Sequence, residues 1–142
     1  MGWSALFNAT NAISLVAWAL LVLGPRGPRT AAIILFFGVG LLCLAYAAMF
    51  IAQIETVFHG DFTGVEGIRA LFQNDGGVVL GWTHYLAFDL FIGQWIAKDA
   101  DHKGFSRVAQ APVLLLTLLA GPIGLLIWLV IRERRARRPA NG

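Results

Sequence analysis

Four long apolar stretches, separated by short polar segments, make up most of this 142-residue chain. Each is close to the about 20 residues that an α-helix needs to cross the hydrocarbon core of a bilayer. We therefore predict an all-α protein, a four-helix transmembrane bundle with short loops, that forms a single integral membrane domain over residues 1–142. The predicted spans cover residues 3–23, 30–52, 77–97 and 111–131, and a basic tail follows at 132–142.

The connection between the second and third spans, residues 52–76, is the longest in the chain. Within it, apolar residues recur every three to four positions, as they do along one face of an amphipathic helix. We predict an interfacial amphipathic segment there, which could cap the opening of a cavity, and a solvated connector is the alternative. The residues that carry this pattern are Val65, Ile68, Leu71 and Phe72.

Two further patterns concern the first and fourth spans. Polar side chains three to four residues apart form a stripe along the first span, which either joins helices or lines a polar cavity. In the fourth span the sequence Gly-Pro-Ile-Gly at 121–124 predicts a kink, because proline removes a backbone donor and clashes with the preceding turn. The polar stripe comprises Ser4, Asn8, Asn11 and Ser14.

The composition supports a membrane protein and argues against nucleic acid as a partner. Apolar residues make up 58% of the chain and charged residues only 13%, against about 25% charged residues in a typical soluble domain. The net charge of +3 does not indicate nucleic acid, because five of the eleven basic residues lie in the tail directly after the last apolar stretch. We expect that tail to bind lipid phosphates at the membrane surface.

The charged connections give little guidance to orientation. With four spans, both termini lie on one side of the membrane, together with Arg69 and the five arginines of the tail. Five basic residues lie on the other side, so the balance is six against five, and only the density of the tail favours cytoplasmic termini. The five opposing residues are Arg26, Arg29, Lys98, Lys103 and Arg107.

The third span carries a histidine and an aspartate, His84 and Asp89, near the middle of an otherwise apolar sequence. An Asp at that depth costs about 2.5–3.5 kcal/mol on insertion scales. Ionisable groups that are kept inside a membrane are usually functional. We therefore interpret His84 and Asp89 as an acid–base pair and as the candidate catalytic residues.

Helical geometry constrains how this pair can act. A separation of five residues turns about 140° around a helix, so His84 and Asp89 do not share one narrow face. Tyr85 lies four residues before Asp89, a spacing at which its hydroxyl could donate a hydrogen bond to the carboxylate. Trp82, Tyr85 and Gln94 are the candidate residues for lining a substrate pocket around the pair.

Other interpretations of these residues stay open. His84 and Asp89 could form a buried structural pair, or belong to a small proton- or ion-coupled transporter. A metal site could draw on Asp99, Asp101 and His102, or on His59 and Asp61, but their spacing matches no specific metal motif. The chain also lacks the signatures of a hydrolase, a kinase or a nicotinamide-dependent enzyme. We expect neither a metal nor a cofactor.

An aromatic stripe accompanies the pair along the third span. It would suit a long, flat and apolar ligand such as an isoprenoid. The same stripe is also typical of plain helix packing. The stripe consists of Trp82, Phe88, Phe91 and Trp95.

The third span also resembles a known signature. Residues 82–91 read Trp-x-His-x-x-x-x-Asp-Leu-Phe, with a closing Asp99, and resemble the signature helix of the abscisic-acid-deficient-four family of small membrane proteins, the neoxanthin synthase type. A Pro-x-Gly element at 122–124 is similar to one in the last span of that family. The clear likeness covers residues 81–127. At 93–94 this chain has Gly-Gln where the plant pattern has a basic residue.

The resemblance implies a four-helix integral membrane protein that acts on a carotenoid. For the plant relatives it implies conversion of violaxanthin to neoxanthin, which opens a 5,6-epoxide and forms an allene without net redox change. Such a step needs an acid that protonates the epoxide oxygen and a base that removes a carbon-bound proton. The resemblance makes His84 and Asp89 the candidates for those roles.

We therefore predict a carotenoid- or isoprenoid-related membrane protein, either a binding protein or a cofactor-independent epoxide or double-bond isomerase. The alternative is a non-catalytic accessory protein that packs against a larger membrane complex, and a homo-oligomer around a shared pocket is also compatible with this size. The expected partners are the lipid bilayer and an apolar isoprenoid or carotenoid ligand, and no nucleic acid. The Arg-rich and Ala-rich ends are typical of a bacterial protein, so we expect a bacterial inner membrane.

Overall fold

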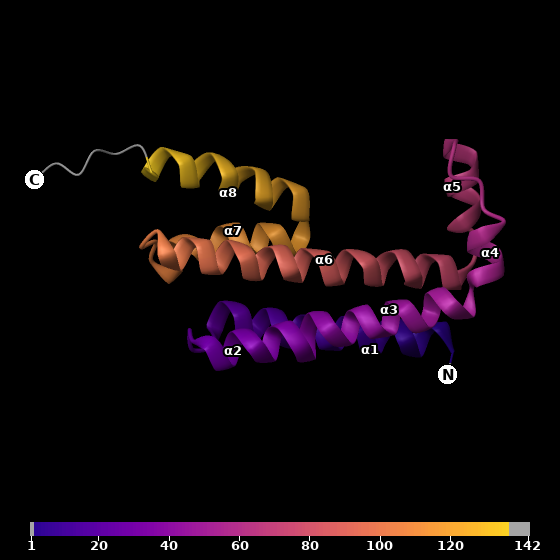
Figure 1. Cartoon of the computed structure of the whole chain (residues 1–142), viewed down its shortest axis with the longest axis horizontal. Helices are drawn as coiled ribbons and strands as arrows, with labels where there is room; N and C mark the ends of the chain where they lie inside the picture. The colour runs from indigo at the N-terminus through magenta and orange to yellow at the C-terminus, as the bar shows by residue number, and fades with distance from the viewer. Residues whose placement is uncertain (1, 137–142) are drawn as a thin grey trace, which may run out of the picture.

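The computed structural model describes residues 2–136, and every regular element in that range is helical. The prediction of an all-α protein is therefore confirmed. Figure 1 shows the arrangement of these helices. In chain order they are α1 (Trp3–Leu23), α2 (Pro28–Ile33), the π-helical η1 (Ile34–Gly40), α3 (Leu41–Ala52), α4 (Ile54–Phe58), α5 (Val65–Leu71), α6 (Asp75–His102), α7 (Arg107–Leu119) and α8 (Gly121–Ala136).

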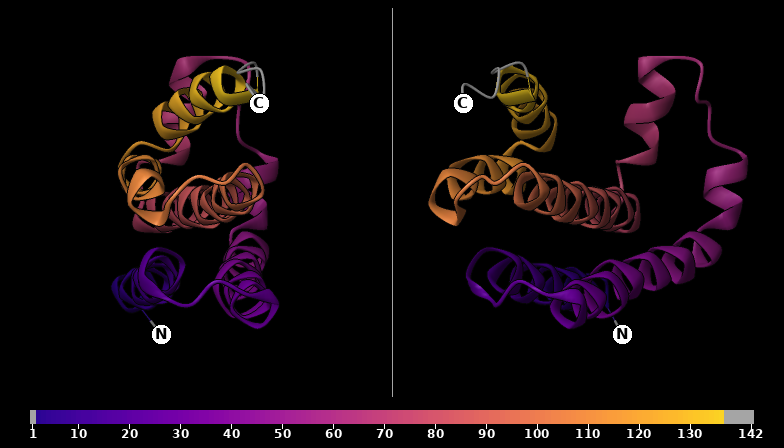
Figure 2. Two further views of the ribbon diagram at one scale, coloured as in Figure 1. Left: turned by 90° about the vertical axis from the view of Figure 1, so that its left-hand side faces the viewer. Right: turned by 60° about the vertical axis from the view of Figure 1, so that its left-hand side comes forward.

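Two helices are long and apolar enough to cross a membrane by length and composition. They are α1 and the continuous helix Pro28–Ala52 that α2, η1 and α3 form together, and they match the predicted spans 3–23 and 30–52. The two run antiparallel and side by side along one flank of α6 (Figures 1 and 2). Pro28 begins the second helix, since a residue in the first turn needs no backbone donor.

The second helix changes to π-helical geometry over η1. Gln94 of α6 reaches the turn just before it, where its side-chain Nε2 donates a hydrogen bond of 2.6 Å to the carbonyl oxygen of Ala31. A side chain that inserts into the backbone hydrogen-bond pattern is a recognised cause of such local distortion. We attribute the π-helical stretch to this contact.

The central element is α6, which packs against α1, η1 and α3 and also against α7 and α8. Its 28 residues extend about 42 Å at the usual helical rise. Asn74 caps its start, because the side-chain oxygen accepts a hydrogen bond of 2.9 Å from the backbone N–H of Gly77. The core along it includes Trp18, Leu21, Ile34, Leu42, Leu90, Ile96, Leu114 and Trp128.

The prediction of one continuous fourth span over 111–131 is wrong. After α7 the chain leaves helical geometry at Ala120, with φ −152° and ψ 69°, and returns as α8. Pro122 favours the break, because it lacks a backbone donor and its ring clashes with the preceding turn. Gly124 permits the reversal, because a side chain there would overlap Thr117 of α7. A helical hairpin therefore forms where the sequence predicted a kink (Figure 1).

The α7–α8 hairpin covers only one half of α6 (Figure 1). Three long helices and a half-length hairpin thus replace the predicted bundle of four full-length helices. The start of α1 and the end of α8 consequently lie at opposite ends of the long axis. The four-span layout, which placed both termini on one side of the membrane, would instead put the start of α1 and the end of α8 at the same end of the molecule.

At the start of α6, the connection 53–74 contains the two short helices α4 and α5. The structure confirms that the predicted amphipathic segment is helical, because α5 covers Val65–Leu71. It stands across the long axis of the molecule (Figures 1 and 2), as a helix lying in the plane of a membrane surface would. Its location at a membrane interface stays a prediction.

Candidate functional site

One face of α6 is left uncovered between the α4–α5 connection and the turn of the α7–α8 hairpin (Figure 1). Large side chains on this face are exposed, among them Tyr85 at 59% and Phe88 at 58%. A contiguous apolar surface of this kind typically contacts lipid, a ligand or another protein. We call it the open face of α6 and define it by Val78, His84, Tyr85 and Phe88.

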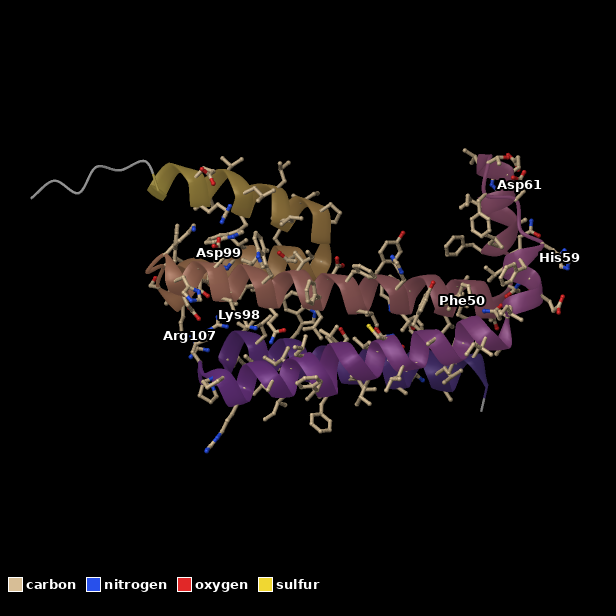
Figure 3. The ribbon with its side chains drawn as sticks, viewed as in Figure 1. Phe50, His59, Asp61, Lys98, Asp99 and Arg107 are labelled. Carbon is tan, nitrogen blue, oxygen red and sulfur yellow. The ribbon has the colours of Figure 1, made fainter. Side chains whose placement is uncertain are left out.

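A cavity of about 280 Å³ adjoins the open face, where α3, α4 and α5 meet the start of α6. Its walls are mainly apolar and aromatic, as is usual for sites that bind small molecules. Phe50, one of these walls, lies between α3 and α6 (Figure 3). We call this space the aromatic cavity, and its apolar walls include Phe50, Val57, Phe62, Leu71, Phe72 and Leu80.

Five polar side chains line the aromatic cavity: Tyr46, Gln53, Thr56, His84 and Tyr85. The amide Nε2 of Gln53 is buried and has no hydrogen-bond partner among the described residues. A buried donor without a partner costs about 1–3 kcal/mol, so it favours a ligand that brings an acceptor. The cavity thus combines an apolar lining with an available amide donor.

His84 belongs both to the open face and to the aromatic cavity. Its ring lies among aromatic rings, with centroid distances of 4.6 Å to Phe88, 5.7 Å to Tyr46 and 6.2 Å to Tyr85. Within the part of the chain that the structure describes, it forms no ion pair. Its imidazole is therefore held by ring contacts and keeps both nitrogens available to a ligand.

Asp89 lies at the other edge of the open face, against the turn of the α7–α8 hairpin. Its half-buried carboxylate contacts Gly121 so closely that any side chain at that position would overlap it. Among residues 2–133, whose side chains are described, no hydrogen bond or ion pair reaches this carboxylate. An uncompensated carboxylate at mid-helix is a typical functional feature in a membrane protein.

The structure does not bring His84 and Asp89 into contact. They lie about 7.5 Å apart along the helix axis and about 140° apart around it, and His84 faces α3 whereas Asp89 faces the α7–α8 turn. Tyr85 lies between them, and its expected hydrogen bond to Asp89 is not formed in the described structure. A ligand on the open face would therefore meet the two groups at different atoms.

Trp82 and Gln94, the other candidates for lining the pocket, do not line the aromatic cavity and bond to other helices. The indole Nε1 of Trp82 donates a hydrogen bond of 3.2 Å to Oδ1 of Asn11 on α1, and its ring contacts Phe7. Gln94 is only 4% exposed and is bonded to Ala31. Both side chains join helices, as does Asn11 from the polar stripe predicted on the first span.

Sequence reasoning gave no role to Tyr46 and Gln53, which line the aromatic cavity. They lie at the end of the second apolar helix, seven residues apart, a spacing that places both on one helical face. That spacing was the available signal. The spacing alone did not indicate a binding site, because the cavity walls on α5 and α6 come from distant parts of the sequence.

Asp99, the closing residue of the signature, lies between α6 and α8 (Figure 3). Its carboxylate accepts hydrogen bonds of 2.7 Å from Nε of Arg132 and 3.0 Å from Nε1 of Trp128, and lies 3.2 Å from Nζ of Lys103. The hydrogen bond from Arg132, with Lys103 beside it, lowers the pKa of Asp99 to about 2. Asp99 therefore fastens the hairpin to α6.

The described residues contain no group of three His, Cys, Asp or Glu side chains that could hold a metal ion. Asp101 and His102, which were weighed as metal ligands, make separate contacts. Asp101 pairs with Arg26 at 3.5 Å, and Nδ1 of His102 lies 2.7 Å from the carbonyl oxygen of Lys98.

Comparison with known proteins gives one match. A family model described as ABA DEFICIENT 4-like matches residues 5–128, which run from the first turn of α1 to the middle of α8. Searches of curated proteins and of solved structures found no match.

Proposed function

The chain belongs to the ABA DEFICIENT 4-like family, and from this membership we propose that it is a membrane protein that binds a carotenoid or related isoprenoid and isomerises it. The family name supports a carotenoid- or abscisic-acid-related role. The open face of α6 and the aromatic cavity are the proposed site.

Membrane insertion is supported by the surface of the long helices. α1 and the helix Pro28–Ala52 have suitable length and composition. Large apolar side chains also point outward along them, including Phe36 and Phe37 at 67% exposure each. Such a continuous apolar exterior is unfavourable in water and favourable in hydrocarbon. A bacterial inner membrane stays the predicted location.

The observation that carries the proposed ligand class is the unpartnered Gln53 amide in an aromatic cavity next to an exposed aromatic face. A polyene chain is flat and apolar, so it would lie along Tyr85 and Phe88. An oxygenated end ring would enter the cavity, where the Gln53 amide and the Tyr46 hydroxyl would donate hydrogen bonds to its oxygen. This division of polar and apolar contacts suits an oxygenated carotenoid better than a hydrocarbon one.

His84 and Asp89 are the proposed acid–base groups. Isomerisation of an epoxide to an alcohol with a new double bond needs one proton delivered to the oxygen as its carbon–oxygen bond breaks. It also needs one proton removed from carbon, whose bonding electrons form the double bond. The protons balance and no electrons enter or leave, so the residues of this chain suffice for the proposed reaction. Because the two groups occupy opposite edges of the open face, each would serve a different atom of the ligand.

A non-catalytic accessory role is the second possibility. The observation in its favour is the half-length hairpin, which leaves aromatic residues of α6 such as Tyr85 and Phe88 exposed. A partner helix, or a second copy of this chain, could cover that face in place of a ligand.

Pigment binding tests the proposal directly. The protein would be purified from a host that makes epoxidised carotenoids, and bound pigment measured by absorbance and chromatography. Wild type should retain pigment, and Gln53→Leu should lose most of it. Gln73→Leu, a change of the same kind at an exposed position of the same connection, is the matched control. Wild-type protein without pigment would favour the accessory role.

A further inference from the structure

The two ends of the molecule carry opposite charge. The end formed by α4, α5 and the start of α6 has four acidic residues and, as its only basic side chain among the described residues, Arg69. The end that holds the α1–α2 turn, the α6–α7 turn and the last turn of α8 is strongly basic (Figures 1 and 3). Its described basic side chains are Arg26, Arg29, Lys98, Lys103, Arg107 and Arg132.

The α7–α8 reversal strengthens this partition, because it brings Arg132 to the end that already holds the other basic residues. The even balance expected from four spans becomes a strong excess at one end. Lysine and arginine concentrate on cytoplasmic connections of membrane proteins, and the cytoplasmic leaflet carries anionic lipids. The basic end therefore belongs at an anionic membrane surface.

The acidic residues at this end are already neutralised. Asp99 is paired with Arg132 and Lys103. Asp101 is paired with Arg26. Lys98 forms no ion pair within the described part of the chain, so its charge stays available to an anion.

A cavity of about 430 Å³ opens at the basic end between α1, α2 and α6, and we call it the basic-end cavity. Arg26, Thr30, Lys98 and His102 provide polar groups to it, and Asp101 also lines it. The Nε of Arg26 is buried and lies 3.5 Å from Oδ2 of Asp101, and its Nη2 donates a hydrogen bond of 2.9 Å to Oε1 of Gln110. The cavity thus offers an anionic group the free cation of Lys98 and the hydroxyl of Thr30. Its deeper walls are Leu20, Leu21 and Ile34.

An apolar groove of about 330 Å³ continues from this cavity along α1 and η1, and we call it the apolar groove. Leu20 and Ile34 line both spaces, so the two are adjoining. No charged side chain lines the groove. The combined shape is a polar head compartment followed by an apolar channel. Its other walls are Ala12, Ile13, Val16, Ala17, Ile33 and Phe37.

We propose that these two spaces form a binding site for one anionic phospholipid of the cytoplasmic leaflet. The headgroup phosphate lies in the basic-end cavity within reach of Lys98 and Thr30. One acyl chain lies in the apolar groove between α1 and η1. Asp101 does not oppose this, because it is occupied by Arg26 and by the side-chain amide of Gln110, which donates to it at 2.8 Å. The proposal rests on the proposed membrane insertion, and it is independent of the pigment.

Lipid binding by the purified full chain tests the site. Native mass spectrometry would count phosphatidylglycerol or phosphatidylcholine retained after addition to the protein in detergent. Wild type should retain phosphatidylglycerol in preference to phosphatidylcholine. Lys98→Gln should weaken phosphatidylglycerol binding about fivefold, the usual effect of one basic residue near an anionic surface. Arg29→Gln, at the same end but outside the cavity, should leave it nearly unchanged.

A second pair of variants tests the groove. Ala12→Phe places a ring in the apolar groove and should reduce retention of phosphatidylglycerol. Ala19→Phe makes the same change at an exposed position of α1 outside the groove and should not.

Two results would overturn the proposal. Equal losses in Lys98→Gln and Arg29→Gln would show diffuse attraction to the basic end without a built site. Equal retention of the two lipids by wild type would show that the site does not discriminate between lipids by the charge of their headgroups. Pigment measured in the same preparations separates this proposal from the proposed function, because Lys98 and Ala12 lie outside the aromatic cavity.

Discussion

The carboxylate of Asp89 lies directly against Gly121, where the chain reverses between α7 and α8. This contact places a charged group from the middle of α6 beside the turn of a half-length hairpin. It also makes glycine the only residue that fits at position 121 with the carboxylate in place. The hairpin turn and the candidate acid–base residue are therefore structurally dependent on each other.

Gly121→Ala should destabilise the protein, because the added methyl group overlaps the Asp89 carboxylate. Overpacking of this kind costs about 1–3 kcal/mol. Thermal unfolding in detergent would measure the loss, with Gly40→Ala as a control whose methyl group meets only an ordinary contact at 3.4 Å. The double variant with Asp89→Ala should recover part of the stability. Additive losses in the double variant would refute the contact.

Stability should fall in acid through Asp99. Its folded-state pKa of about 2 lies below the ordinary value of 3.8. The ionised form is therefore favoured by folding, and its contribution is complete above 3.8 and disappears as the pH falls from 3.8 to about 2. The melting temperature measured across that range should decline less in Asp99→Asn than in wild type. The same decline in both proteins would assign the acid sensitivity to other carboxyls.

The reversal at Ala120 predicts that the connection 53–74 and the end of α8 lie on opposite sides of the membrane. Single cysteines would be introduced at Thr63 and Glu133 in a Cys43→Ser background and treated with a membrane-impermeant maleimide in intact cells. Thr63→Cys should be labelled, and Glu133→Cys should react only after lysis. A third cysteine at Ser4 should behave like Thr63→Cys. Labelling of Thr63→Cys and Glu133→Cys from the same side would restore the four-span arrangement.

Much of the helical layout could be predicted from hydrophobic length alone. The first span matches α1 at both ends, and the second differs by two residues at its start. The amphipathic spacing at 65–72 also identified α5. These helices follow from patterns within a few turns of the chain, so their positions can be predicted from the sequence.

The hairpin could not be predicted in the same way. Pro122 indicates a disturbed helix. Whether the chain then kinks or reverses depends on contacts between the two helical segments and with α6, which local sequence patterns do not specify. The reversal depends on Gly124 packing against Thr117, and on Asp99 binding Arg132 across 33 positions of sequence. The relative placement of the start of α1 and the end of α8 could not be predicted for the same reason, because it follows from the hairpin.

The candidate site stays a prediction, and the sequence could supply only some of its residues. His84 and Asp89 were proposed from the cost of ionisable groups in an apolar helix, which is a local property. Which helices they face is decided by packing, and so the aromatic cavity with Tyr46 and Gln53 was not foreseen. Trp82 and Gln94 were assigned to a pocket from their nearness in sequence, whereas their hydrogen bonds join α6 to other helices.

Conversion of an epoxidised carotenoid tests the proposed function most directly. Chromatography would compare the pigments of a carotenoid-producing host that expresses wild type, His84→Ala or Asp89→Asn, with exposed His59→Ala and Asp61→Asn as matched controls. We predict an isomeric product with wild type and with both controls. Loss of a general acid or base lowers rates by about 10²–10⁴-fold, so the product should disappear in both site variants. An unchanged product in His84→Ala and Asp89→Asn, or no product with wild type, would contradict the assignment of the open face of α6 as a catalytic site.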